Sequence, residues 1–227
     1  MTSQASFPLS QEELHSTLEA RHGSDAQARF DAACVGIAGL GGLGSHVAVS
    51  LTRLGIGHLI LVDFDVVEAS NLHRQHYCGR DLGKPKAYAL AHQLQDINPY
   101  LAFNPYVERL TPHNTKEIFK PCDIIIEAFD VPEEKAWFTQ TCLHQLPHAT
   151  LIGASGMAGS GRATTITTTH PFARYYLCGD GSSDVATHQS LMAPRVSVCA
   201  NHMATAAMRL ILGLDPLEDS PEESQGL

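Results

Sequence analysis

The sequence predicts an α/β fold in which helices flank a doubly wound, mainly parallel sheet, with a short antiparallel extension toward the C-terminus. Short apolar segments, such as the three isoleucines of Asp123–Glu127, are typical of strands buried on both faces of a parallel sheet. Helical patterns alternate with these segments, which is the order of βαβ units with right-handed crossovers. A glycine-rich turn joins the first strand to the next helix. These three observations define the fold class.

Two helices are predicted before the first strand. Ser10–Arg21 begins at a serine that is followed three residues later by Glu13, which is the spacing of a capping box. Ser24–Ala33 is a shorter second helix. We expect three regions: N-terminal helices over residues 1–33, a main domain over 34–213, and an acidic, flexible tail over 214–227.

The first strand, turn, helix and second strand form one βαβ unit. Cys34–Ala38 is a short apolar strand that ends at the glycines of Gly39–Gly44. Ser45–Leu54 is helical, and His58–Val62 is the next strand, followed at once by Asp63. Two parallel strands joined by a helix place their carboxyl ends at the same edge of the sheet.

The alternation then continues to residue 154. The predicted elements are helix Lys86–Ile97, strand Ala102–Val107, strand Asp123–Glu127, helix Pro132–Leu146 and strand Thr150–Ala154. Beyond them, Gly161–Thr169 is rich in β-branched residues and predicts a later strand. We expect Phe172–Pro194 to be a long irregular loop and Ser197–Leu212 to be a closing helix.

Composition limits the class of partner and the compartment. The chain has 227 residues and a formal net charge of -9. Binding to a phosphate backbone needs a dense Lys/Arg surface, so nucleic acid is not expected. No apolar run reaches the roughly 20 residues of a membrane span, and residues 1–10 lack the pattern of a secretory signal. We expect a cytoplasmic protein that contacts no membrane.

The turn Gly39-Leu40-Gly41-Gly42-Leu43-Gly44 matches the GxGxxG pattern of a Rossmann-like fold. Gly39 permits the tight turn, Gly41 lets a phosphate approach the backbone, and Gly44 lets helix and strand pack closely. The helix that follows presents free N–H groups to an anion. A carboxylate at the end of the second strand accepts hydrogen bonds from ribose hydroxyls. The sequence therefore predicts a nucleotide site at Gly39, Gly41, Gly42, Leu43, Gly44 and Asp63.

The glycine turn alone fits NAD as well as ATP, but the following segment favours ATP. A triphosphate needs cationic partners for its β- and γ-phosphates, and Arg74 and Lys86 are suited to that role. Asn71 and Gln75 are suited to orienting phosphate or ribose oxygens. Asp130 follows a buried strand at the carboxyl edge of the sheet, where a carboxylate holds Mg²⁺ against phosphates.

Several separate motifs in order carry a resemblance to a known family. The stretches GLGGLGS, DFDVVEASNLHRQ (which contains Asp65, a further candidate for nucleotide binding), GKPKA and INPY resemble the adenylation domain of ThiF and MoeB proteins, prokaryotic relatives of ubiquitin-activating enzymes. EAFD, ASGMAG, LCGDG and LMAPRV are most similar to the shorter ThiF subgroup of thiamine biosynthesis. The resemblance covers about residues 20–213.

The resemblance implies an ATP-dependent adenylyltransferase that activates the C-terminal Gly-Gly carboxylate of a small ubiquitin-like sulfur-carrier protein. The glycine turn would cradle ATP, Asp63 would hold ribose, and Asp130 would bind Mg²⁺; Asn71, Arg74 and Lys86 would contact phosphates. The carboxylate attacks the α-phosphate and pyrophosphate leaves. No general base is needed because the nucleophile is already ionised. The resemblance also implies a homodimer.

Two more candidates follow from the resemblance. The family uses an arginine from the N-terminal helix of the partner subunit, and Arg21 is favoured over Arg29, with an ordinary exposed arginine as the alternative. Many relatives bind zinc through two CxxC pairs, but the six cysteines here form none, so no zinc is predicted. Cys178 is then either a nucleophile toward the activated carrier or a buried apolar residue, and the second interpretation is favoured.

Three other functions compete with this one. An NAD-dependent oxidoreductase would need a substrate domain, and no segment is left over to build it. A non-catalytic carrier-binding module would not need Arg74, Lys86 and Asp130. The same chemistry also serves carriers for molybdopterin, other carriers, or a modified nucleoside on tRNA, and the acidic composition disfavours tRNA.

Overall fold

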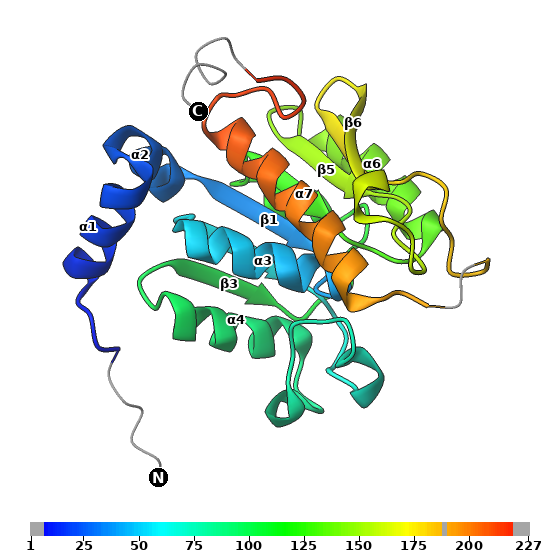
Figure 1. Ribbon diagram of the computed structural model, residues 1–227, viewed down its shortest axis with the longest axis horizontal. Helices are drawn as coiled ribbons and strands as arrows, with labels where there is room; N and C mark the ends of the chain where they lie inside the picture. The colour runs from blue at the N-terminus through cyan, green and yellow to red at the C-terminus, as the bar shows by residue number, and fades with distance from the viewer. Residues whose placement is uncertain (1–6, 188–189, 220–227) are drawn as a thin grey trace.

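The protein is a three-layer α/β domain, seen in a computed structural model that describes residues 7–187 and 190–219 (Figure 1). Its seven-stranded sheet has the order β3-β2-β1-β4-β5-β7-β6. All neighbours pair in parallel except β6 and β7, which are antiparallel. The strands are β1 (Cys34–Ala38), β2 (His58–Val62), β3 (Ala102–Tyr106), β4 (Ile124–Glu127), β5 (Thr150–Ala154), β6 (Thr167–Phe172) and β7 (Tyr175–Gly179). The predicted fold class, with its antiparallel extension, is confirmed.

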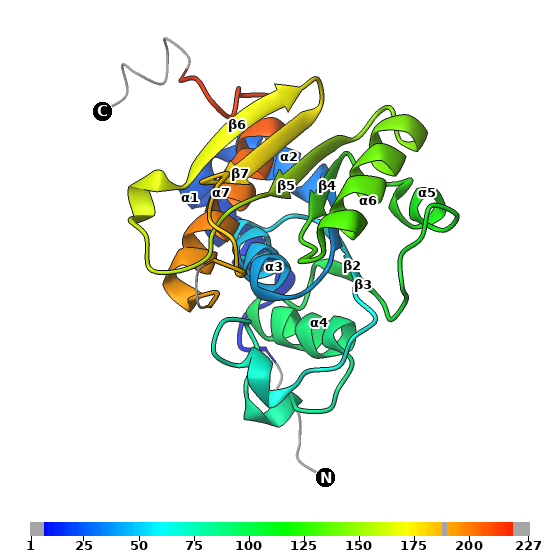
Figure 2. The same cartoon turned by 90° about the vertical axis from the view of Figure 1, so that its right-hand side faces the viewer.

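Helices cover both faces of the sheet, as Figures 1 and 2 show. One face packs against α3 (Gly42–Leu54), α4 (Lys86–Ile97) and α7 (Ala193–Ile211). The other packs against α5 (Thr115–Phe119) and α6 (Pro132–Gln145). Because strand residues alternate between the two cores, Ile60 and Ile125 face α5 and α6, whereas Leu61 and Ile126 face the opposite layer. The core is therefore divided by the sheet, as expected for a doubly wound fold.

The N-terminal helices lie at the edge of this domain. They are α1 (Gln11–His22) and α2 (Ser24–Ala32). The capping box of α1 is present: the Glu13 N–H donates to Ser10 Oγ over 3.2 Å, and the Ser10 N–H donates to the Glu13 carboxylate over 2.8 Å. The predicted flexible tail covers residues 214–227, and its part from residue 220 onward lies outside the described residues. Before that point, Arg209 donates to the carbonyls of Asp215 and Glu218.

The structure corrects the prediction in three places. The expected irregular loop Phe172–Pro194 contains β7, the partner of β5. The strand expected over Gly161–Thr169 begins only at Thr167, after a 3₁₀ turn at Ala163–Thr165. The last helix begins at Ala193, because Pro194 occupies its first turn, where a missing N–H costs nothing.

Candidate active site

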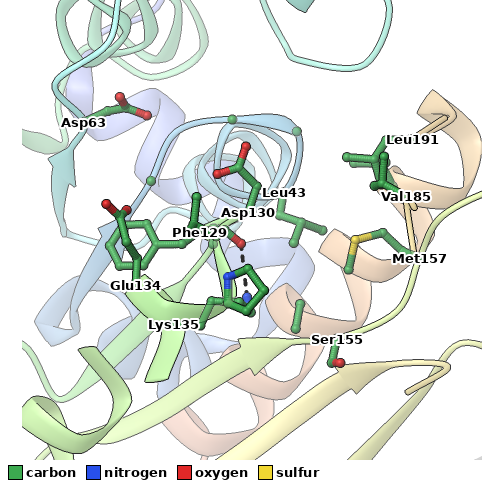
Figure 3. Close-up of a pocket in the computed structure, with 18 of the residues that line it drawn as sticks. Leu43, Asp63, Phe129, Asp130, Glu134, Lys135, Ser155, Met157, Val185 and Leu191 are labelled. Atoms are coloured by element: carbon green, nitrogen blue, oxygen red, sulfur yellow. Dashed lines mark hydrogen bonds between the residues drawn. The ribbon is translucent and has the colours of Figure 1, made fainter. Parts of the chain in front are cut away.

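A cavity of about 480 Å³ opens at the carboxyl ends of β1, β2, β4 and β5 (Figure 3). This edge is where a doubly wound sheet places its ligands. One wall is built by the glycine turn and the segment after β2. The rest of the lining comes from the segment after β4, the start of α6, and residues 155–158 and 181–185.

The glycine turn uses its glycines for three separate purposes. Gly39 has a φ of 89°, in the left-handed region, and lies so close to Ala128 that a Cβ would be 2.9 Å from the Ala128 carbonyl oxygen. Gly41 is the N-cap residue of α3, where no side chain caps the helix, and it lines the cavity. A Cβ on Gly44 would lie 1.9 Å from the Gly39 carbonyl oxygen. Gly44 is therefore a packing residue, whereas Gly39, Gly41, Gly42 and Leu43 line the cavity.

Asp63 lies at the end of β2 with only 8% of its surface exposed. Its carboxylate accepts hydrogen bonds from the Leu40 N–H over 2.7 Å and from the Asp65 N–H over 2.8 Å. Burial raises the pKa of Asp63, while the charge of Lys86 and these hydrogen bonds oppose the shift. The carboxylate is thereby tied to the glycine turn and held as an acceptor beside it.

The predicted cations lie on the same wall. The Lys86 ammonium donates to the Asp65 carboxylate over 3.0 Å, with the lysine side chain 8% exposed and the aspartate 50% exposed. Arg74 donates to the Ser70 carbonyl over 3.2 Å and lines the cavity. Gln75 is buried beside Gly41, and its Oε1 has no partner among the described residues. The structure thus brings Arg74, Gln75 and Lys86 together with the glycine turn.

Asn71, another predicted contact of the nucleotide, is not among the residues that line the cavity. Its Oδ1 accepts a hydrogen bond from the Glu68 N–H over 3.0 Å, and the residue is buried. In this structure Asn71 shapes the turn that carries Arg74. Its contact with the nucleotide stays a prediction.

Asp130 lines the cavity and is exposed, three residues after the end of β4 (Figure 3). Beneath it lies an ion pair that sequence analysis missed: the Lys135 ammonium donates to Glu127 over 2.7 Å and to the Phe129 carbonyl over 3.1 Å. Glu127 is fully buried, and burial raises its pKa against the influence of Lys135. The signal was present, since an acidic residue that ends an apolar strand needs a cation nearby.

Residues 181–185 also line the cavity, and a second buried ion pair precedes them. The Arg195 guanidinium donates to the Asp180 carboxylate, and the exposed fractions of the two side chains are 5% and 10%. Asp180 also accepts from the N–H groups of Ser182 and Ser183 over 2.9 and 2.7 Å. Although burial acts to raise it, these hydrogen bonds and Arg195 hold the pKa of Asp180 well below its usual range.

Two predicted site residues lie away from the cavity. Arg21 is exposed at the end of α1, and no residue of α1 lines the cavity of its own chain. Arg29, the other candidate, donates to the Leu212 carbonyl over 2.9 Å. Cys178 is fully buried in β7, and burial raises the pKa of its thiol to about 11. A protonated, inaccessible thiol is the opposite of an activated nucleophile, so the geometry favours the packing role.

Within the described residues, no three His, Cys, Asp or Glu side chains gather as a protein-only metal site would require. Across 7–187 and 190–219, no helix has the length and apolarity of a membrane span.

The fold and the glycine turn define a Rossmann-like α/β domain, and comparison with known sequences supplies its family. The ThiF family matches residues 15–224, so the chain belongs to the ThiF family. A sulfur carrier protein adenylyltransferase of Thermus thermophilus is 41% identical over 109 residues, which cover 48% of this chain and 40% of the relative. The adenylyltransferase and sulfurtransferase uba4 of Pyricularia oryzae is 30% identical over 216 residues, covering 89% and 44%.

Solved structures share the fold. The tRNA N6-threonylcarbamoyladenosine dehydratase TcdA of E. coli, in complex with AMP, superposes with a TM-score of 0.79 at 22% identity, covering 92% of this chain and 98% of that one. The chain spans less than half the length of the curated relatives named above. These comparisons do not favour the oxidoreductase.

Proposed function

We propose that this chain is an ATP-dependent adenylyltransferase that activates the C-terminal Gly-Gly carboxylate of a small ubiquitin-like sulfur-carrier protein. One observation carries the proposal: a single cavity brings together the glycine turn, the buried carboxylate of Asp63, and the cations Arg74 and Lys86. Relatives named as adenylyltransferases support the reaction class.

The residues divide the chemistry by position. The N–H groups of the glycine turn and the start of α3 would bind phosphate oxygens, and Asp63 would accept from ribose hydroxyls. Lys86 would exchange its exposed partner Asp65 for phosphate, and Arg74 would add a second cation. The acceptor carboxylate attacks the α-phosphorus, the bond to pyrophosphate breaks, and the electron pair leaves with pyrophosphate. Catalysis is then positioning and charge neutralisation.

Asp130 would hold Mg²⁺ beside the phosphates. An exposed carboxylate on the cavity wall fits that ion, because Mg²⁺ is usually bound by one or two carboxylates together with substrate phosphates. When bound, the ion would neutralise charge on the departing pyrophosphate.

The finer assignments are part of the same proposal. The subgroup motifs EAFD, ASGMAG, LCGDG and LMAPRV support a carrier of thiamine biosynthesis, with molybdopterin-type carriers as the alternative. We also propose a homodimer in which Arg21 enters the partner's site, and a cytoplasmic location, where ATP is available.

ATP–pyrophosphate exchange tests the proposal. The protein would be assayed with Mg²⁺, ATP and each of several carriers ending in Gly-Gly, alongside Asp130→Ala and a carrier that lacks its last glycine. We expect exchange that needs the intact carrier and is lost in Asp130→Ala, with the thiamine carrier fastest. Absence of exchange with every carrier, together with tight NAD binding, would refute the proposal.

A further inference from the structure

We propose that Lys135 is a further catalytic residue, which binds the acceptor's non-attacking carboxylate oxygen while the other oxygen attacks the α-phosphorus. The inference rests on the proposed function and assigns a residue to its acceptor half. Lys135 belongs to the first turn of α6 and lines the same cavity as Arg74 and Lys86. Figure 3 shows it between Phe129 and Ser155.

The ammonium of Lys135 is aimed by two fixed acceptors. Glu127 and the Phe129 carbonyl accept two of its three N–H groups, over 2.7 and 3.1 Å. Among the described residues, these two groups are the hydrogen-bond acceptors of the Lys135 ammonium. Its third N–H is therefore available to a ligand in the cavity. The lysine side chain is 23% exposed, whereas Glu127 is 0% exposed. The carboxylate therefore stays beneath the cavity floor and only the cation reaches the substrate.

Charge around the cavity gives this cation its importance. The bases that line it are Arg74, Lys86, Arg109 and Lys135, and the acids are Asp63, Asp65, Glu108, Asp130, Glu134 and Asp184. Arg109 pairs with Glu134 over 2.8 Å, another residue of the cavity wall. A carboxylate that approaches a triphosphate here meets a net negative site. Lys135 supplies a cation to this lining, at the start of α6 and five residues after Asp130.

The assigned step conserves atoms and charge. One carboxylate oxygen forms the new bond to phosphorus, and the bond from phosphorus to pyrophosphate breaks with its electron pair. The other oxygen becomes the carbonyl oxygen of the acyl adenylate and keeps its hydrogen bond to Lys135. The lysine gives up no proton. A buried Lys–Glu pair adds little net stability by itself, which is consistent with a functional role for this one.

The test compares AMP with a glycyl-sulfamoyl-adenosine, a stable mimic of the acyl adenylate that carries the carbonyl oxygen. Trp137 is the single tryptophan and lines the cavity, so its fluorescence reports binding of either ligand. The variant is Glu127→Gln with Lys135→Met, which removes the cation without leaving a buried charge unpaired. Lys116→Met, on an exposed lysine of α5, is the matched control.

We expect the double variant to bind AMP within about twofold of the wild-type protein but to lose about 10- to 100-fold in affinity for the mimic, the strength of one charged hydrogen bond. Lys116→Met should bind both normally. An unchanged preference for the mimic in the folded double variant would overturn the inference. Equal losses for AMP and the mimic would also overturn it, because they would place Lys135 on the nucleotide.

A second measurement needs no variant. Reductive methylation of Lys135 in the wild-type protein, followed by mass spectrometry, should be slowed by the mimic more than by AMP. Equal modification with both ligands would overturn the assignment. Neither measurement uses a carrier, so failure of wild-type exchange would refute the proposed carrier chemistry while the binding data still decide the role of Lys135.

Discussion

Two alanine substitutions in the glycine turn should affect different properties, one the stability of the fold and the other the affinity for ATP, because the two positions have different surroundings. In Gly44→Ala the new methyl group would lie 1.9 Å from the Gly39 carbonyl oxygen and 3.1 Å from Ile37 Cγ2. In Gly41→Ala the nearest atom is Gln75 Nε2 at 3.7 Å, an ordinary contact. The first change therefore strains the fold, and the second fills space on the cavity wall.

The magnitude follows from the contacts. Atoms normally meet at about 3.5–4.0 Å, so Gly44→Ala requires the helix and turn to move apart by more than about 1 Å. Overpacking costs about 1–3 kcal/mol, and a backbone obstacle places this case at the upper end. The better helix propensity of alanine offsets about 1 kcal/mol. The net loss of about 2 kcal/mol lowers Tm by roughly 4–8 °C in a domain of this size.

Thermal unfolding by circular dichroism and ATP titration by Trp137 fluorescence measure the two effects separately. Gly41→Ala should keep its stability within about 0.5 kcal/mol of wild type but bind ATP at least about tenfold more weakly, because its methyl group blocks the approach of phosphate to the backbone. Normal ATP affinity in Gly41→Ala would refute phosphate binding at this turn. Wild-type stability in Gly44→Ala would refute the packing argument.

Three more substitutions test other parts of the structure. Cys178→Ala should leave pyrophosphate exchange within about twofold of wild type, since the thiol is buried with a pKa of about 11; lost exchange in a folded variant would contradict this. Phe138→Ala, at a fully buried ring, should lower the free energy of unfolding in urea by about 3–5 kcal/mol. Asp180→Asn should cost about 3 kcal/mol at pH 7 by leaving Arg195 unpaired. Because the folded-state pKa of Asp180 lies below the unfolded value of 3.8, that cost should shrink as the pH falls below 3.8, and a pH-independent difference would refute it.

The nucleotide half of the fold was predictable because its signals are local. The strand β1, its glycine turn and the strand β2 each carry a pattern within a few residues, and the structure places them as expected. The predicted capping box at Ser10 is also confirmed, and it depends only on the spacing of Ser10 and Glu13. Asn71 shows the limit of such signals, because a buried amide serves a turn or a ligand equally well and only the fold decides.

The missed strand β7 has a specific physical cause. A hairpin is usually predicted from Gly or Asn at its turn, where φ is positive. Here Arg174 occupies that position, with a φ of 63°. Its guanidinium donates to the carbonyls of Leu143, Leu146 and Ala149 over 2.9, 3.2 and 2.7 Å. Long-range hydrogen bonds thus stabilise a turn that no local pattern reveals.

The difference between local patterns and long-range contacts also explains which half of the candidate site could be predicted. The glycine turn and the cations after β2 are close in sequence, so one motif contains them. The rest of the cavity lining depends on pairs formed by folding, which are Lys135 with Glu127 at the end of β4 and Arg195 with Asp180 before residues 181–185. Each pair fixes a segment that lines the cavity. Variation in these pairs should therefore affect the acceptor's part of the cavity more than the glycine turn, since neither pair contacts that turn through any hydrogen bond found in the described residues.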